Sequence, residues 1–308
     1  MKMIHWTMAI LFGMVITSCT LSKTDYEAEL STAIPETTEF EEAFSINSNG
    51  YQIRVNALGG TFYKGYNELH FEITETATQE AIANATVTLL PIRTTTNAEA
   101  YSCPHSEVVA FQTTDAYYEG YSVFDVETDT DASWVLYLSI TVAGETFNLE
   151  QPIEVAEQEN LNLNMTSFTG NDGVQYYIAL IAPVSPSVAE NELIAGVYQY
   201  NEPETAGGDF PDPSQFSFSE VEGATLLLDP RMPEPNMGNH SSPNNEDLTQ
   251  EGDGLYYGVV NYTMTGNWTL NFIFQNAAGD VIKGTEVPTD FTPGVEGEKS
   301  ELYIDILF

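Results

Sequence analysis

Two methionines and one histidine lie within nine residues in the C-terminal half of the chain, in the order Met232-x4-Met237-x2-His240. Thioether sulfur and imidazole nitrogen are soft to borderline donors that suit Cu(I) and, with more nitrogen, Cu(II). A ligating histidine needs a partner for its second ring nitrogen, and Asn236 and Asn239 are candidates for that role. The segment therefore predicts a copper site with Met232, Met237 and His240 as ligands.

The same three residues have a second interpretation, which involves no metal. Methionine fills irregular gaps well, so Met232 and Met237 could simply cover the open end of a β-sandwich, with His240 at the surface. The chain would then be a structural or interaction module of the cell envelope. Such a module binds a protein or a glycan through its loops or through an exposed strand edge. The sequence leaves both interpretations open.

An internal repeat sets this segment apart from its counterpart in the first half. The repeat includes four pairs of matching segments, which occur in the same order: 67–69 with 191–193, 85–91 with 224–230, 118–120 with 256–258, and 134–136 with 268–270. Between the second and third pairs, Asn97, Ser102 and Pro104 match Asn236, Ser241 and Pro243 without a gap. In the first half the three candidate ligands are replaced by Arg93, Ala98 and Tyr101. Because all three are absent together, the segment indicates a site gained or lost as a unit.

Residues 224–274 resemble the YtkA-like/FixH-like family of small exported β-sandwich domains, which are similar in style to CopC-type copper carriers. The resemblance rests on the strand that ends at Pro230 and on the loop residues Met232-Pro233 and Met237-x2-His240. It continues in the segments 254–258 and 264–268. Members of the family are associated with copper handling near respiratory oxidases. The resemblance implies copper ligation by the same two methionines and histidine, and a copper-acceptor protein as partner.

Other residues that could bind a metal or react form weaker patterns. Cys103 and His105 could bind a metal or react, but no third ligand accompanies them. His70 lies among polar positions of an alternating strand, which predicts a solvent-facing side chain. Trp134 and Trp268 stand at matched strand starts and are expected to anchor the core. Since no nucleophile motif such as Gly-x-Ser-x-Gly occurs, we expect no enzymatic activity.

Strand patterns dominate the segments that must position these residues. Runs rich in β-branched and aromatic residues alternate with turns of Gly, Pro, Asn and Asp. The expected strands are 51–55, 69–73, 134–140, 177–181, 193–200, 268–274 and 302–307. No long stretch has helical periodicity. The pattern predicts an all-β protein with two tandem immunoglobulin-like β-sandwich domains.

The repeat places these two domains at 45–156 and 163–308. The first is the degenerate copy, and the second is the YtkA-like copy with the candidate metal loop. The segment 154–164 is the expected linker between them.

The N-terminus predicts export and lipidation. Residues 1–18 have the basic start and short apolar run of a signal peptide, which is too short to span a bilayer. Ile16-Thr17-Ser18-Cys19 resembles a bacterial lipobox, which implies a lipid on Cys19 as the membrane attachment. Residues 19–44 are acidic and poor in large apolar side chains, so we expect a flexible tether. The cell envelope, and in it the outer membrane, is the expected location.

The charge of the chain excludes several partners. Forty-six acidic residues face eight basic ones, for a formal net charge of −38. Such a surface repels nucleic acid and anionic membrane, so neither is an expected ligand. The only cysteines are Cys19 and Cys103. If Cys19 carries lipid, the fold has no internal disulfide and depends on burial alone.

Overall fold

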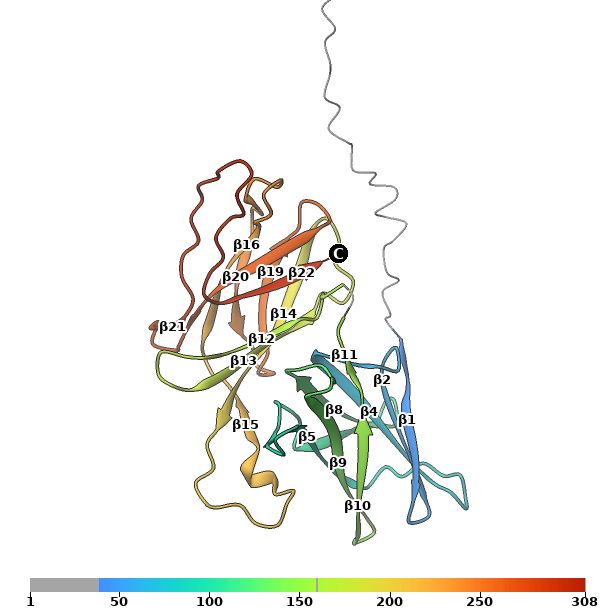
Figure 1. Ribbon diagram of the computed structural model, residues 1–308. Coiled ribbons are helices and arrows are strands. Elements are labelled where there is room, and N and C mark those ends of the chain that lie inside the picture. Colours follow the sequence, from blue (N-terminus) through green and yellow to red (C-terminus); the bar gives the residue numbers. More distant parts are fainter. Residues whose placement is uncertain (1–38, 159, 308) are drawn as a thin grey trace, which may run out of the picture. The chain divides into compact units, whose positions relative to one another are not determined.

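The computed structural model describes residues 39–158 and 160–307 (Figure 1). This part of the chain consists of strands and loops, apart from one short 3-10 helix, η1 (Pro213–Gln215). The predicted all-β class is confirmed. In the described ranges no helix is long and apolar enough to span a membrane. The predicted signal peptide, Cys19 and most of the predicted tether lie outside the described residues.

The first half of the chain forms a nine-stranded curled sheet and one small two-stranded sheet. The strand order in the large sheet is β1-β2-β4-β8-β7-β5-β9-β10, and β6 pairs with β5. The bounds are β1 (Phe40–Ser48), β2 (Tyr51–Leu58), β4 (Gly65–Glu75), β5 (Thr86–Thr95), β6 (Ala100–Tyr101), β7 (Val108–Gln112), β8 (Tyr117–Phe124), β9 (Ala132–Val142) and β10 (Glu145–Ile153). The small sheet pairs β3 (Phe62–Tyr63) in parallel with β11 (Val155–Ala156).

The second half forms an eleven-stranded sheet in the order β12-β13-β14-β19-β18-β16-β20-β21, with β15, β17 and β22 attached to β14, β16 and β20. The bounds are β12 (Met165–Thr169), β13 (Gln175–Ala182), β14 (Glu190–Asn201), β15 (Ser217–Glu220), β16 (Thr225–Met232), β17 (His240–Ser241), β18 (Glu246–Gln250), β19 (Tyr256–Asn261), β20 (Asn267–Gln275), β21 (Val281–Lys283) and β22 (Tyr303–Leu307).

The two large sheets have the same topology. Read strand by strand, the eight-strand path of the first sheet matches the path of the second, with β5 in the place of β16 and β9 in the place of β20. The two-residue strands β6 and β17 also attach at the same place. Each repeated sequence segment therefore lies on the strand that corresponds to its partner's strand.

Matching polar contacts fix corresponding strands in both halves. The amide of Asn67 accepts a hydrogen bond from the N–H of the residue four positions earlier and donates to the carbonyls four and two positions earlier. The amide of Asn191 makes the same three bonds. The Tyr118 hydroxyl donates to Ile82 O and accepts from Ala85 N–H, and the Tyr256 hydroxyl bonds the two corresponding backbone groups.

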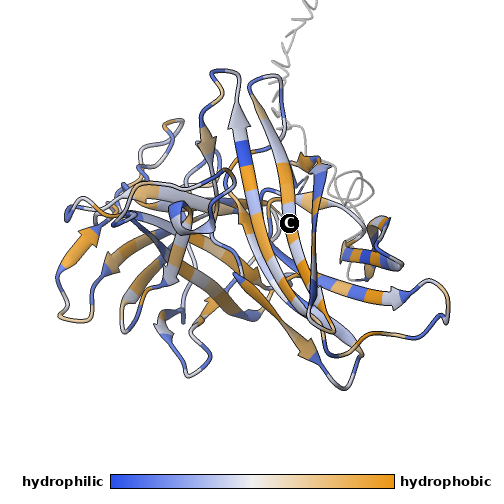
Figure 2. Cartoon of the chain, turned by 90° about the horizontal axis from the view of Figure 1, so that it is seen from below, coloured by the Kyte–Doolittle hydropathy of each residue, from blue (hydrophilic) through white to orange (hydrophobic). Residues whose placement is uncertain are grey.

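Hydrophobic and hydrophilic residues alternate along several strands in Figure 2. In β9 every second residue is buried, as expected for a strand with one face on the core. Trp134 and Trp268 are both fully buried in the two main cores, as predicted. Each indole N–H donates to a backbone carbonyl, of Val126 and Met264 respectively. The tryptophans thus close the same end of each core.

The predicted tether extends too far along the chain. Strand β1 begins at Phe40, whereas the tether was expected to extend to residue 44. Ala43 and Phe44 pack against the first core, and the ring of Phe40 stacks on that of His70 at 3.9 Å. These apolar contacts are sufficient to pair residues 40–44 with β2, so their assignment to a flexible segment was wrong.

The predicted domain boundaries, 45–156 and 163–308, stay a prediction. Both large sheets belong to one compact unit. A third cluster of buried residues combines Val123 of β8 with side chains of β12, β13 and β14, namely Met165, Tyr177, Ala179 and Tyr198. The two sheets therefore share part of their buried surface.

Candidate metal site

The candidate ligands lie at one end of the second sheet, where β16 turns into β17. Residues 233–239 form the turn, in which Met237 N–H donates to Glu234 O and His240 N–H donates to Met237 O. Gly238 and Asn239 both have positive φ angles, 68° and 51°. Glycine and asparagine tolerate this left-handed backbone best, which explains how so tight a reversal forms here.

Two of the three candidate ligands face each other directly. Met232 is the last residue of β16, and His240 is its register partner on β17. Directly opposed residues of an antiparallel pair project to the same face, so the thioether and the imidazole share one side. Met232 is 1% exposed within the second core, and His240 is half-buried.

The third candidate, Met237, belongs to the same end of the core. Its side chain is partly buried and packs against the second core, of which Met232 is also a member. The structure therefore places all three predicted ligands around one end of one hydrophobic core. Met232 approaches from inside that core, whereas Met237 and His240 lie at its margin.

The His240 ring is held by a residue that the sequence patterns did not indicate. Its Nε2 is 2.8 Å from Thr263 Oγ1, and its centroid lies 6.1 Å from the Trp268 ring in an edge-on arrangement. Within residues 39–158 and 160–307, the ring's Nδ1 has no hydrogen-bond partner. If Nε2 carries the proton, Nδ1 offers its lone pair to a metal.

The two asparagines do not serve as the predicted partners of His240. The left-handed backbone of Asn239 directs its amide toward a different segment, where Nδ2 donates to Pro288 O at 3.0 Å. Asn236 makes no hydrogen bond to the ring. No pattern in the sequence pointed to Thr263, which corresponds to Asp125 of the first half when Tyr118 is aligned with Tyr256.

The corresponding end of the first sheet holds a positive charge of its own. Arg93 and Tyr101 are register partners on β5 and β6, as Met232 and His240 are on β16 and β17. The Arg93 guanidinium lies 5.0 Å from the centroid of Tyr101 and 6.0 Å from that of Trp134. It also forms a largely buried ion pair with Asp125, with 3.2 Å between Nη1 and Oδ2.

Cys103 and His105 do not form a metal site. Both side chains are buried, and His105 Nδ1 lies 2.7 Å from the backbone oxygen of Cys103. Burial raises the pKa of the Cys103 thiol well above its ordinary value, which disfavours the thiolate that would bind a metal or react. No cluster of three or more His, Cys, Asp or Glu side chains suited to a metal occurs in the described part of the chain.

The prediction of a solvent-facing His70 was wrong. The side chain is buried, and its ring lies between those of Phe40 and Tyr117, at 3.9 Å and 3.8 Å. Its Nε2 is 2.6 Å from Glu68 Oε1. The error arose because the start of β1, which supplies Phe40, was assigned to the tether, so no residue was expected to cover the His70 ring.

Comparison with known proteins does not assign the chain to a family. No family model matches it, and no curated protein matches it. Among solved structures it is similar to one described as "The crystal structure of the conserved domain protein from Bacillus anthracis", with 11% identity and a TM-score of 0.27. The match covers 89% of this chain and 92% of that chain. At this TM-score the likeness carries no argument.

Proposed function

We propose that this chain is an envelope lipoprotein, anchored through Cys19, that binds Cu(I) through Met232, Met237 and His240 and delivers it to an acceptor protein. The observation that carries the proposal is the register pairing of Met232 with His240. Nε2 of the histidine is held by Thr263, and Nδ1 has no hydrogen-bond partner among the residues that the structure describes. Two thioethers and one imidazole are a neutral donor set that suits a soft monovalent ion.

Comparison with the first half supports this assignment. There the same position of the fold holds a cationic guanidinium near two aromatic rings, those of Tyr101 and Trp134. In the second half Met232 replaces Arg93 and Thr263 replaces Asp125, so neither member of the ion pair remains. A metal ion would restore a positive charge beside Trp268, whose ring face attracts cations.

The test is a Cu(I) titration of the full chain against a competing chelator, under reducing and anaerobic conditions. We expect one tight equivalent in the parent and none in the M232L/M237L/H240Q variant. Leucine conserves the buried volume of methionine without its sulfur donor, so the fold should survive. A circular-dichroism melt of each variant checks that point.

The matched control is M165L, which removes a buried methionine of β12 that lies outside the turn. It should bind copper as the parent does. Equal affinity in the parent and the triple variant, or no competition with the chelator by the parent, would overturn the proposal. The methionines would then be packing residues, and the non-metal interaction module would be the better description.

A further inference from the structure

The second sheet carries an insertion that the first lacks. In the first sheet β9 turns directly into β10, which runs unbroken along it from Glu145 to Ile153. In the second sheet two short strands, β21 and β22, pair with β20 in place of one long strand. Residues 284–302 separate them and leave the edge of the sheet. We call this segment the insertion.

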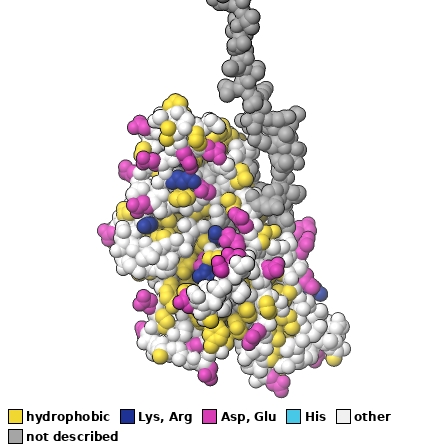
Figure 3. Space-filling view, in the orientation of Figure 1, with side chains coloured by type: hydrophobic (Ala, Val, Ile, Leu, Met, Phe, Trp, Pro, Cys, Tyr) yellow, Lys and Arg dark blue, Asp and Glu magenta, His cyan; other side chains and the backbone are white. Residues whose placement is uncertain are grey.

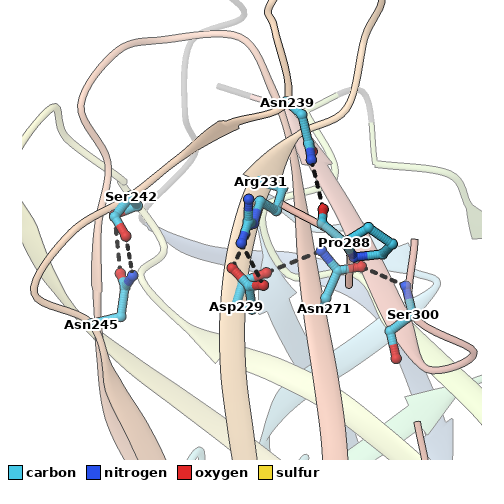
Figure 4. A network of polar contacts seen from close by, with 8 residues as sticks. All are labelled: Asp229, Arg231, Asn239, Ser242, Asn245, Asn271, Pro288 and Ser300. Carbon is cyan, nitrogen blue, oxygen red and sulfur yellow. Dashed lines mark hydrogen bonds and ion pairs between the residues drawn. The ribbon is translucent and has the colours of Figure 1, made fainter. Parts of the chain in front are cut away.

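Hydrogen bonds pin the insertion at several points (Figure 4). Ser300 is buried, its N–H donates to Asn271 Oδ1 at 2.8 Å, and its hydroxyl donates to Phe272 O at 2.9 Å. Gly297 N–H donates to Pro233 O at 2.7 Å, and Pro288 O accepts from Asn239. The insertion is thus attached to the rest of the second half by hydrogen bonds near both of its ends and in between, and it forms one side of the space described below.

The outward face of β16 and β20 next to the insertion is polar, whereas the same face of the first sheet is apolar. The cross-strand pairs Leu90–Tyr137 and Asp229–Asn271 occupy corresponding places in the two registers. Two residues further along, Ile92 corresponds to Arg231. The second sheet has therefore replaced three apolar side chains with an acid, a base and an amide.

The acid and the base form a two-point ion pair. Arg231 is only 8% exposed, and its Nε and Nη2 donate to the two carboxylate oxygens of Asp229 at 2.7 Å and 3.0 Å. The Asp229 side chain itself remains 40% exposed. This fork geometry shows that the face already binds one guanidinium group.

An open cleft of about 280 Å³ lies between this face and the insertion. Its apolar walls are Leu227, Ile273 and Val287, and its charged groups are Asp229, Arg231, Asp247 and Glu286. Asp247 uses one carboxylate oxygen to accept from Leu228 N–H at 2.8 Å. Three acids against one paired base leave an excess of negative charge in the cleft.

The charge decides what kind of ligand can enter. An anion would meet the acidic lining of the cleft and the −38 charge of the chain. Acidic side chains are scattered over the side of the molecule that Figure 3 shows, with few basic ones. An apolar ligand would leave the carboxylates desolvated without a partner. A cationic head on an apolar stem matches both the acids and the walls.

We propose that this cleft binds an alkylguanidinium or alkylammonium group, presented either by a basic side chain of a polypeptide or by a free amine. Glu286 and Asp247 are the carboxylates assigned to the incoming cation, because Asp229 already holds Arg231. The proposal is independent of copper, since neither Met232 nor His240 lines the cleft.

The test is a titration of the full chain, followed through the NMR signals of the Arg231 and Asn271 side-chain N–H groups. The probe is N-acetyl-arginine methylamide, and its control is the citrulline analogue, which has nearly the same shape and no charge. We expect saturable shifts with arginine only, weakened by added salt. Agmatine binding tighter than the peptide analogue would identify a free amine as the ligand, and the reverse order would identify a polypeptide.

The E286Q/D247N variant should weaken arginine binding about tenfold, because the charge-assisted bonds are lost while the amide oxygen introduced by D247N still accepts from Leu228 N–H. The matched control is E298Q, an exposed acid of the insertion that does not line the cleft. Equal binding of the citrulline analogue, unchanged affinity in E286Q/D247N, or the absence of saturable shifts would each overturn the proposal.

Discussion

The two halves of this protein share the side-chain contacts that stabilise their sheets, but they differ in the residues at one end of each core. Both halves retain the asparagine that binds the chain four residues back, the tyrosine that bonds a neighbouring loop, and the buried tryptophan. Near the tryptophan, however, the first half has the Arg93–Asp125 ion pair, whereas the second half has Met232 and Thr263 at the corresponding positions. The comparison teaches that the scaffold and the loop chemistry can change separately.

The largest effect on stability should come from replacing only one member of the Arg93–Asp125 pair with its counterpart from the second half. R93M removes the base and leaves Asp125 buried without its partner, so the free energy of unfolding should fall by about 3 kcal/mol at neutral pH. Burial already raises the pKa of Asp125, and the charge of Arg93 opposes that rise. The cost of R93M should therefore shrink as the pH falls and Asp125 becomes protonated.

The double variant R93M/D125T gives the first half the Met and Thr of the second. It removes the uncompensated charge, so most of the lost stability should return. Urea unfolding of the parent, both single variants and the double variant gives the coupling energy directly. If the double variant loses as much free energy of unfolding as the two single variants together, the residues of the two ends are not interchangeable. That result would contradict the correspondence between the two halves.

A smaller difference between the halves concerns His105, which corresponds to Asn244. Burial lowers the pKa of His105 from its ordinary 6.5, so the folded chain binds this proton less readily than the unfolded chain does. Stability is then lost as the pH falls through 6.5. Asn244 has no titrating group, so the second half should lack this dependence.

H105N should remove that part of the pH dependence. The measurement is the difference in unfolding free energy between the parent and H105N, just above and just below pH 6.5. Taking the difference cancels the carboxylates, which titrate in both proteins. The same slope in parent and variant would show that His105 stays accessible to protons in the folded state.

Much of the fold could be predicted from the sequence, because strand alternation and the repeat are local patterns. The expected strands at 51–55, 134–140 and 268–274 all lie within observed strands. Strand β1 was missed because its apolar residues are widely spaced among acids, and their burial depends on partners such as His70, far along the chain. The insertion was missed because it has no counterpart in the first half.

The candidate site was predictable in type more than in geometry. The spacing of Met232, Met237 and His240 predicted a set of candidate donor atoms, but the register that opposes Met232 to His240 depends on β17, a strand of only two residues. The partner of the histidine is separated from it by more than twenty residues. A search for partners within the loop therefore selected Asn236 and Asn239 and missed Thr263.

The smallest expected effect tests that last contact. T263V removes the hydroxyl that lies 2.8 Å from His240 Nε2. The free energy of unfolding should fall by only about 0.5 kcal/mol, because the half-buried ring can bond water instead. In the first half, by contrast, the corresponding position carries a full charge, which makes D125T much more costly there.

The same substitution should matter more for copper than for folding. Without Thr263 the imidazole loses the contact that fixes its tautomer and orientation, and partners of this kind are worth about tenfold or more in metal affinity. T263S retains the hydroxyl and should bind Cu(I) as the parent does in the chelator competition. If T263S and T263V weaken binding equally, the methyl group rather than the hydroxyl supports the ring, and Thr263 is then a packing residue rather than the functional counterpart of Asp125.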